Sequence, residues 1–309
     1  LAVIYGDEFM QYDLGQDHPL NQMRLLLTYE LMDQIGLLSA PSVCVESPRM
    51  ASIEEVLLFH HDYYIDYVRH ACALGTGFLD SGDTPAFEGG LESSQCVVGG
   101  SIRAADLVMS GEVDHAFNIG GGLHHAHPNR ASGFCVLNDV AVAICHLKAK
   151  YSLDRIVYID IDAHHGDGVM YGFYNDAGVL DIDFHEDGRY LFPGTGRMVE
   201  LGEGPGRGLK INVPLPPHCG DASFLYAFRE LVPPAIRRYQ PQIVLLQCGA
   251  DAHGRDPLTE LNLSNRSYAE VATVVHELAH ELCGGRLLMF GGGGYNVANV
   301  AVCWSLMAS

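Results

Sequence analysis

Four short apolar runs, each followed directly by Gly, Asp or His, constrain the fold of this chain most strongly. Runs that are apolar on both faces and rich in β-branched residues are typical of strands inside a parallel sheet. They cover residues 116–119, 156–159, 243–248 and 287–290. Segments with helical spacing of apolar residues, such as 138–150 and 268–282, lie between them. The sequence therefore predicts one α/β domain over residues 1–309, with a doubly wound, mostly parallel sheet flanked by helices.

Composition excludes several classes of function. The chain has 309 residues with 18 Lys+Arg against 38 Asp+Glu, which gives a formal charge of −20. Direct binding of nucleic acid or of an anionic membrane is therefore not expected as the main activity. The nine Cys include no C-x-x-C pair, which disfavours a disulfide framework or a cysteine zinc site. No secretory signal, membrane-length apolar run or nuclear-localisation run is present, so we expect a bacterial cytoplasmic protein.

The densest polar cluster follows the second apolar run. Alternate residues of an extended segment share a face, so Asp160, Asp162 and His164 point the same way. The polar ends of parallel strands meet at one edge of the sheet, and Asp251 follows another strand there. Asp162, His164 and Asp251 would give a divalent ion three protein ligands and one open position, as in a catalytic zinc site. Fe²⁺ or Mn²⁺ would also suit this ligand set, and the alternative is that the carboxylates cap helices or pair with Arg.

A second cluster, His124-His125, follows three glycines at the same edge. A hydrolase needs a base for water and an acid for the leaving group, and imidazole titrates near neutral pH. Asp160 and Asp167 are the spare carboxylates that could orient these rings. Tyr295, which follows four glycines, could donate a hydrogen bond to an oxyanion. The alternatives are surface histidines after a glycine turn and a tyrosine in a loose turn.

Two further histidine pairs are interpreted as structural. His276, Glu277 and His280 form an H-E-x-x-H sequence, which is a zinc-protease motif in other proteins. The same segment carries a clear apolar core face, and no other polar cluster points to it, so we treat it as a competing but incidental site. His60-His61 is expected at the edge of an amphipathic stretch over 54–68.

Six ordered motifs resemble those of a known family. They are Gly-Gly-Leu-His-His-Ala, Ala-Ser-Gly-Phe-Cys-Val-Leu-Asn-Asp, Tyr-Ile-Asp-Ile-Asp-Ala-His-His-Gly-Asp-Gly-Val, His-Glu-Asp-Gly-Arg-Tyr-Leu-Phe-Pro-Gly-Thr-Gly, Gln-Cys-Gly-Ala-Asp and Gly-Gly-Gly-Gly-Tyr-Asn. Together they resemble the zinc-dependent histone deacetylase family, including its bacterial members and acetoin-utilisation proteins, from about His18 to Trp304. The resemblance implies an arginase/deacetylase-type fold and hydrolysis of an N-acetylated amine by a metal-activated water.

The resemblance also implies roles for individual residues of the reaction site. The metal ligands of the family correspond to Asp162, His164 and Asp251, the same three residues that the spacing suggests. His125, supported by Asp167, resembles the general base and acid, and His124, supported by Asp160, resembles the second histidine. Tyr295 resembles the phenol that polarises the acetyl carbonyl.

Substrate contacts are implied in the same way. Phe134 and Phe192 resemble the aromatic walls of an acetyl-lysine tunnel, and Gly133 would accept a hydrogen bond from the lysine amide. Leu258 would line the rim. Asp83, in Gly-Asp-Thr-Pro, resembles the rim aspartate that holds the substrate backbone.

Some positions depart from the family pattern. Arg24 resembles the arginine of an internal acetate channel, but the usual nearby Pro is Gln22 here. A K⁺ site would involve Asp160 and Asp183, where the family commonly has Ser in place of Asp183. The related arginases bind a second metal through an Asp two residues after the one matching Asp251, and this position is His253 here. That difference disfavours a binuclear centre.

The leading interpretation is a Zn²⁺-dependent (or Fe²⁺-dependent) deacetylase that removes acetyl or a related acyl group from lysine side chains of proteins or peptides. An enzyme acting on acetylpolyamines or other small N-acyl amines is one alternative, although such relatives usually have Asn at the place of Asp167. A module that binds acetyl-lysine without hydrolysis is another, and a ureohydrolase-like binuclear enzyme is a third. The acidic charge could attract a cationic substrate such as a histone tail or a polyamine, or it could simply keep the protein soluble.

Overall fold

A single parallel sheet runs through the computed structural model, which describes residues 1–309. Its strands are β1 (Ala2–Ile4), β2 (Cys44–Glu46), β3 (His115–Asn118), β4 (Ile156–Asp160), β5 (Val179–Glu186), β6 (Lys210–Leu215), β7 (Ile243–Gln247) and β8 (Leu287–Phe290). They are ordered β2-β1-β3-β8-β7-β4-β5-β6, and every neighbouring pair is parallel. The predicted α/β fold with a mostly parallel sheet is thus confirmed, and the sheet is entirely parallel.

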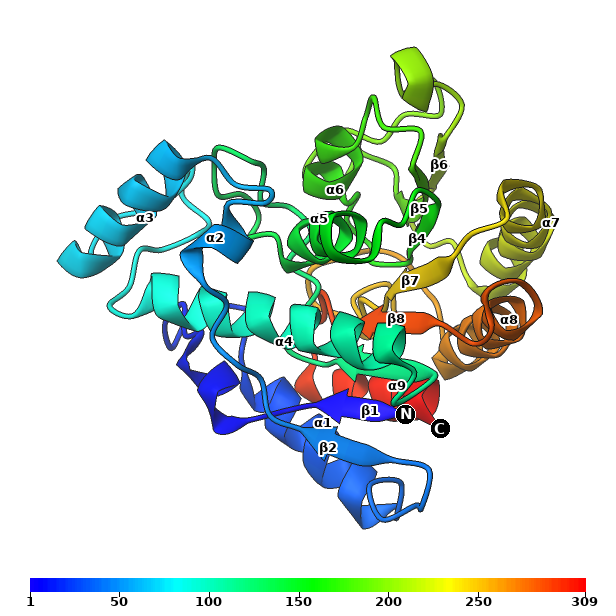
Figure 1. The fold of residues 1–309 in the computed structure, drawn as a ribbon, viewed down its shortest axis with the longest axis horizontal. Helices are drawn as coiled ribbons and strands as arrows, with labels where there is room; N and C mark the ends of the chain where they lie inside the picture. The colour runs from blue at the N-terminus through cyan, green and yellow to red at the C-terminus, as the bar shows by residue number, and fades with distance from the viewer.

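Helices cover both faces of the sheet (Figure 1). They are α1 (Met23–Gln34), α2 (Ile53–Val56), α3 (Asp62–Leu74), α4 (Gly90–Ser110), α5 (Asp139–Tyr151), α6 (Asp167–Gly172), α7 (Asp221–Tyr239), α8 (Asn265–Cys283) and α9 (Val297–Ala308). Helices α1, α9, α8 and α7 pack in a row on one face, whereas α4 and α5 pack together on the other. Short 3₁₀ turns lie at Asp7–Gln11 and Gly204–Gly206.

The core lies between these layers. Every residue of β4, β5, β7 and β8 is buried. Burial on both faces explains the apolar runs of β4, β7 and β8, whereas β5 alternates apolar residues with Asp181, Asp183 and His185. The buried apolar side chains form one connected cluster, with Trp304 among the largest. The division into one domain over residues 1–309 stays a prediction. No helix combines the length and the apolar character that a membrane span requires.

Local signals set the helix ends near the site. Asn138 caps α5, because its side chain accepts a hydrogen bond from the Ala141 N–H. Ser264 caps α8, which ends at Gly284 in the left-handed conformation (φ +65°). These caps account for the agreement between the predicted and observed bounds of both helices.

The expected place of His60 at the edge of the amphipathic stretch over 54–68 was wrong. The stretch divides into α2 and α3, and His60 in the break is buried. Its Nε2 accepts a hydrogen bond from the Asn138 N–H at 2.9 Å. Burial lowers the pKa of His60 to about 3, so the ring is a neutral acceptor.

Candidate metal centre and active site

Four neighbouring strands deliver the predicted site residues to one edge of the sheet. In the order β3-β8-β7-β4, their carboxyl ends lead into His124-His125, Tyr295, Asp251 and the Asp160–His164 segment. Because these four strands are parallel neighbours, their carboxyl ends lie side by side at one edge of the sheet, where α/β proteins bind their ligands.

The three expected metal ligands meet in a buried cluster. The ligand atoms of Asp162, His164 and Asp251 all lie within 4.8 Å of one another. Asp162 accepts the Gly293 N–H at Oδ2 (2.6 Å) and the His164 N–H at Oδ1 (3.0 Å), and Asp251 accepts the Ala163 N–H at Oδ1 (2.8 Å). Asp162 Oδ1 and Asp251 Oδ2 lie 3.2 and 2.8 Å from His164 Nδ1. The backbone therefore fixes both carboxylates with one oxygen of each turned to the imidazole.

Electrostatics at this cluster favour a cation. Burial disfavours the imidazolium, but the hydrogen bonds of His164 to Asp162 and Asp251 outweigh it and raise its pKa to about 10. Burial and the charge of Asp162 raise the pKa of Asp251. Two buried carboxylates and one imidazole are the ligands of catalytic zinc sites and also suit Fe²⁺, so these residues fit a divalent metal.

Glycines leave the room that the carboxylates need. A Cβ atom at Gly293 would lie 2.3 Å from Asp251 Oδ2, and one at Gly249 would lie 2.1 Å from Asp162 Oδ2. Any side chain at either position would displace a carboxylate. The absence of a side chain at Gly249, after β7, and at Gly293, after β8, is therefore required for the observed positions of the two carboxylates.

Two imidazole–carboxylate pairs adjoin this cluster. His124 Nδ1 lies 2.7 Å from Asp160 Oδ2, and His125 Nδ1 lies 2.7 Å from Asp167 Oδ1. The Nε2 atoms of the two rings are 3.1 Å apart. The pairing of each histidine with its expected aspartate is therefore present, and both Nε2 atoms face the same space.

The two rings have opposite charge preferences. Burial opposes protonation of His124, but the charges of Asp160 and Asp162 raise its pKa to about 10. Burial and the charge of His124 lower the pKa of His125 to about 4, despite its bond to Asp167. At neutral pH His124 is the charged ring and His125 the neutral one, available to accept a proton.

Tyr295 lies beside the cluster at the end of the glycine run. Its ring is perpendicular to those of His164 and Phe134, with centroids 6.3 and 5.8 Å away. Burial, Asp251 and Asp162 raise the pKa of Tyr295 well above its usual value, so the phenol stays a hydrogen-bond donor. Its N–H donates to Asp256 at 2.8 Å, which fixes the loop.

The two expected aromatic walls border the site from different segments. Phe192 packs edge-on against His125, with ring centroids 5.1 Å apart, and is 41% exposed. Phe134 has a positive φ of 70°, and hydrogen bonds from Tyr12 to its carbonyl and from its N–H to Thr84 hold it there. A Cβ at Gly133 would meet Phe192 at 2.7 Å, so this glycine keeps the space between the walls open.

The remaining substrate-contact candidates lie on exposed loops nearby. Asp83 precedes Thr84 and is exposed, as a rim residue would be. Leu258 is 40% exposed, and its N–H donates to Asp256, which also binds the Tyr295 loop. The segment of Asp83 is thus hydrogen-bonded to Phe134 through Thr84, and the segment of Leu258 to Tyr295 through Asp256. The contacts of Asp83 and Leu258 with substrate stay predictions.

Arg24 is buried behind the glycine run. Its Nη1 donates to the Gly292 carbonyl at 2.5 Å, and its guanidinium lies over the Trp304 ring at 5.3 Å. A small cavity of about 20 Å³ runs from His125 and Tyr295 to Gly292, room for about one water molecule. An acetate channel past Arg24 stays a prediction that this placement supports.

The K⁺ site expected at Asp160 and Asp183 also stays a prediction. Asp183 Oδ1 lies 2.6 Å from His185 Nδ1, and its Oδ2 accepts the Gly166 N–H at 2.8 Å. Asp160 is engaged by His124 and by the Tyr158 hydroxyl. Both carboxylates thus have partners within the protein. His253, at the position that disfavours a binuclear centre, packs against Tyr268.

The sequence interpretation missed residues that position the site. His127 Nε2 lies 3.1 Å from Asp167 Oδ2, so a second imidazole, besides that of His125, shares this carboxylate. Asp139 accepts the N–H groups of Gly122 and Leu123 and holds the loop before His124. His127 stands two residues after the histidine pair and could have been noticed, whereas nothing local distinguishes Asp139 from a helix-capping residue.

An all-parallel sheet with a buried Asp–His–Asp cluster and two histidine–aspartate pairs at its carboxyl edge is the arrangement of arginase/deacetylase-type α/β proteins. A sequence model described as "Histone deacetylase domain" matches residues 18–309. The chain is 45% identical over 304 residues to the acetoin utilization protein AcuC of Bacillus subtilis (strain 168), covering 96% of this chain and 78% of that protein. It is 42% identical over 313 residues to AcuC of Staphylococcus aureus (strain MSSA476), covering 98% and 79%. The chain belongs to the histone deacetylase family and is a deacetylase-type hydrolase.

Proposed function

We propose that this protein removes acetyl groups from lysine side chains of proteins or peptides and depends on a divalent metal, Zn²⁺ or Fe²⁺. The observation that carries the proposal is the convergence of the Asp162–His164–Asp251 cluster, the His124–His125 pair and two aromatic walls. A metal ion held by these three ligands would supply Lewis acidity to the acetyl carbonyl and to water.

The protein's own groups would then move the protons. Neutral His125 takes a proton from the attacking water at Nε2 and returns it to the departing lysine amine. Charged His124 and the Tyr295 hydroxyl donate toward the oxygen on which negative charge develops. Asp167 and Asp160 orient the two rings through Nδ1, which directs both Nε2 atoms to the space that they share.

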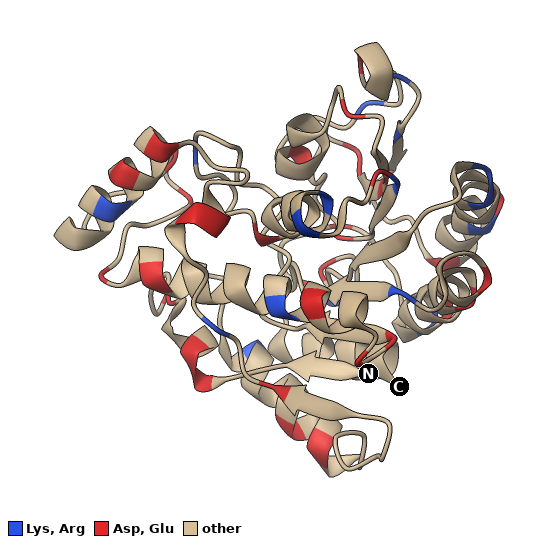
Figure 2. Cartoon of the chain, viewed as in Figure 1, with Lys and Arg blue, Asp and Glu red and all other residues tan.

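The substrate would enter between Phe134 and Phe192. Aromatic walls suit the apolar methylene chain of an acylated lysine, and a buried site excludes bulk water. Asp and Glu residues are spread over most of the elements, whereas Lys and Arg are few (Figure 2). This charge favours a cationic peptide around the acetylated lysine. The bacterial cytoplasm stays the predicted location.

The first experiment compares acetate release from an acetyl-lysine peptide and from an acetylpolyamine, with metal content measured on the same sample. We expect turnover of the peptide with His164→Ala inactive. Turnover of the polyamine alone would support the proposed reaction but identify a small acetylated amine, not a lysine side chain, as the substrate. Binding of the peptide without turnover by the metal-loaded protein would contradict the proposal and favour an acetyl-lysine binding module.

A further inference from the structure

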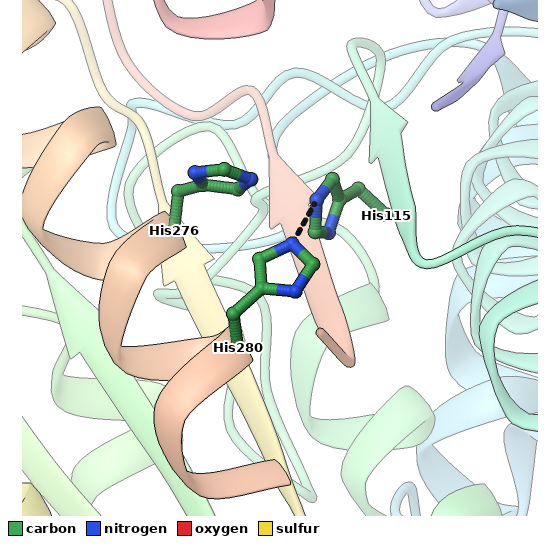
Figure 3. Close-up of side chains that lie close together, drawn as sticks. All are labelled: His115, His276 and His280. Atoms are coloured by element: carbon green, nitrogen blue, oxygen red, sulfur yellow. Dashed lines mark hydrogen bonds between the residues drawn. The ribbon is translucent and has the colours of Figure 1, made fainter. Parts of the chain in front are cut away.

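Three imidazoles cluster at the edge of the sheet opposite the active site. His115 is the first residue of β3, whereas His124 and His125 follow the end of that strand. His276 and His280 lie one turn apart on α8, on the same face (Figure 3). The ligand atoms of the three residues all lie within 4.8 Å of one another.

The fold fixes this arrangement through the connection between α8 and β8. The helix ends at Cys283, Gly284 and Gly285 turn the chain with positive φ, and β8 begins at Leu287. Leu287 pairs directly with His115 in the parallel register. A Cβ at Gly285 would lie 2.9 Å from His280 Cε1, so the backbone of the turn packs directly against the His280 ring. The last turn of α8 is therefore held over the start of β3.

The three rings lack the partners that histidines usually have. None of them lies within hydrogen-bond distance of a carboxylate, and the one side-chain hydrogen-bond contact among them joins His280 Nε2 to His115 Nε2, at 3.3 Å. His115 Nδ1 is buried and has no hydrogen-bond partner. The ring centroids are 4.6 to 5.1 Å apart. Three imidazoles that face one another without a carboxylate therefore have ring nitrogens available to a further ligand.

The spacing suits a tetrahedral metal site. Zinc–nitrogen bonds of about 2.0–2.1 Å at tetrahedral angles place two ligand nitrogens about 3.3 Å apart. The His280–His115 distance of 3.3 Å equals this value. Imidazole sets select Zn²⁺, Ni²⁺ or Cu²⁺ over Mg²⁺ and Ca²⁺, which need oxygen ligands.

We propose that His115, His276 and His280 bind one divalent transition-metal ion of the Zn²⁺, Ni²⁺ or Cu²⁺ type, at a second site separate from the active site. His276 and His280 are exposed, so the fourth position is open to water. Glu277 forms no hydrogen bond or ion pair with the three rings, and the site is a binding site that ties β3 to α8. The H-E-x-x-H sequence thus contributes only its two histidines, and a strand that sequence spacing could not associate with it supplies the third.

The test counts zinc bound by the chelator-treated chain, prepared without a polyhistidine tag and reloaded with Zn²⁺. We expect about two zinc ions per wild-type chain. His280→Ala should lose the second ion, and so should His276→Ala. His164→Ala should keep the ion at the triad and lose the other. His70→Ala, which alters an exposed histidine on α3, should leave both ions bound.

The single variants separate this inference from the proposed function. Zinc retained by His164→Ala but lost by the double variant His164→Ala/His280→Ala supports the triad whether or not the protein deacetylates anything. Equal zinc content in wild type and His280→Ala, together with an equal Co²⁺ absorption spectrum, would overturn the triad site. Both exposed histidines can be replaced without disturbing the core, so these variants should fold.

Discussion

Two adjacent histidines acquire opposite properties because their partners differ. His124 is close to Asp160 and Asp162 and is stabilised as a cation, whereas His125 has one carboxylate partner and the charged His124 as its neighbour. Sequence position alone would make the two residues equivalent. Their division into a charged donor and a neutral acceptor depends on the carboxylate that each ring contacts, Asp160 at the end of β4 or Asp167 at the start of α6.

At the scale of single residues, Tyr295→Phe should retain metal and lose most turnover. Removal of one oxyanion donor typically lowers kcat by about 10²–10³. The measurement is acetate release together with metal content. Tyr226→Phe, at an exposed tyrosine on α7, is the control and should be fully active. Full activity of the Tyr295 variant would exclude this role.

Gly133→Ala should impair substrate entry without loss of metal. The added methyl group would meet His125 Cδ2 at 2.6 Å and Phe192 Cε1 at 2.7 Å. We expect kcat/KM to fall about tenfold, the scale of an overpacked site. Gly77→Ala is a matched control, because Gly77 also has a positive φ (+85°) but open space around it. If both variants lose activity equally, backbone strain rather than steric blocking is the cause.

At the scale of elements, one carboxylate joins α4 to α5. Asp106 on α4 accepts hydrogen bonds from Lys150 and Tyr151, and its Oδ1 lies 2.7 Å from His146 Nε2. Burial alone would raise its pKa, but these partners outweigh it and hold the pKa of Asp106 well below its ordinary value. The ionised carboxylate therefore stabilises the packing of the two helices.

Asp106→Asn should lower the free energy of unfolding at pH 7 by about 1–3 kcal/mol. A carboxyl with a lowered folded-state pKa stabilises the protein fully above its unfolded-state value of about 3.9, and this contribution disappears as the pH falls toward the folded-state value. The difference between wild type and variant, measured by urea unfolding, should therefore shrink below about pH 4. Asp66→Asn, in an exposed pair with Arg69, should change stability by less than about 1 kcal/mol at either pH. A difference that grows in acid would contradict this account.

The sequence predicted the elements of the site better than those around it. The four predicted strands and the helices over 139–151 and 265–283 lie within a few residues of their expected positions, because apolar periodicity and caps are local signals. The break between α2 and α3 was missed, because His60 leaves the helical pattern to accept a hydrogen bond from Asn138, 78 residues away. Hydrogen bonds between residues so far apart in the chain cannot be predicted from the spacing of apolar residues.

At the scale of the whole molecule, the charge of −20 predicts that salt affects association with substrate. The kcat/KM for a lysine-rich acetylated peptide should fall about tenfold when ionic strength rises from about 0.01 to 0.2 M, because screening weakens electrostatic steering. A peptide with Gln in place of its flanking lysines should show little change. Equal salt dependence of the two peptides would attribute the acidic charge to solubility alone.

The strand–loop–helix pattern, the polar clusters at the ends of strands and the chemical types of the ligands could be predicted from the sequence, since they depend on residues close together in the chain. The order of β3, β8, β7 and β4 and the distance between Asp251 and His164 instead depend on long-range packing. The contact of His115 with His276 and His280 depends on it in the same way. The physical reason is that strand order follows from burial of the whole apolar surface, to which segments far apart in the chain contribute together.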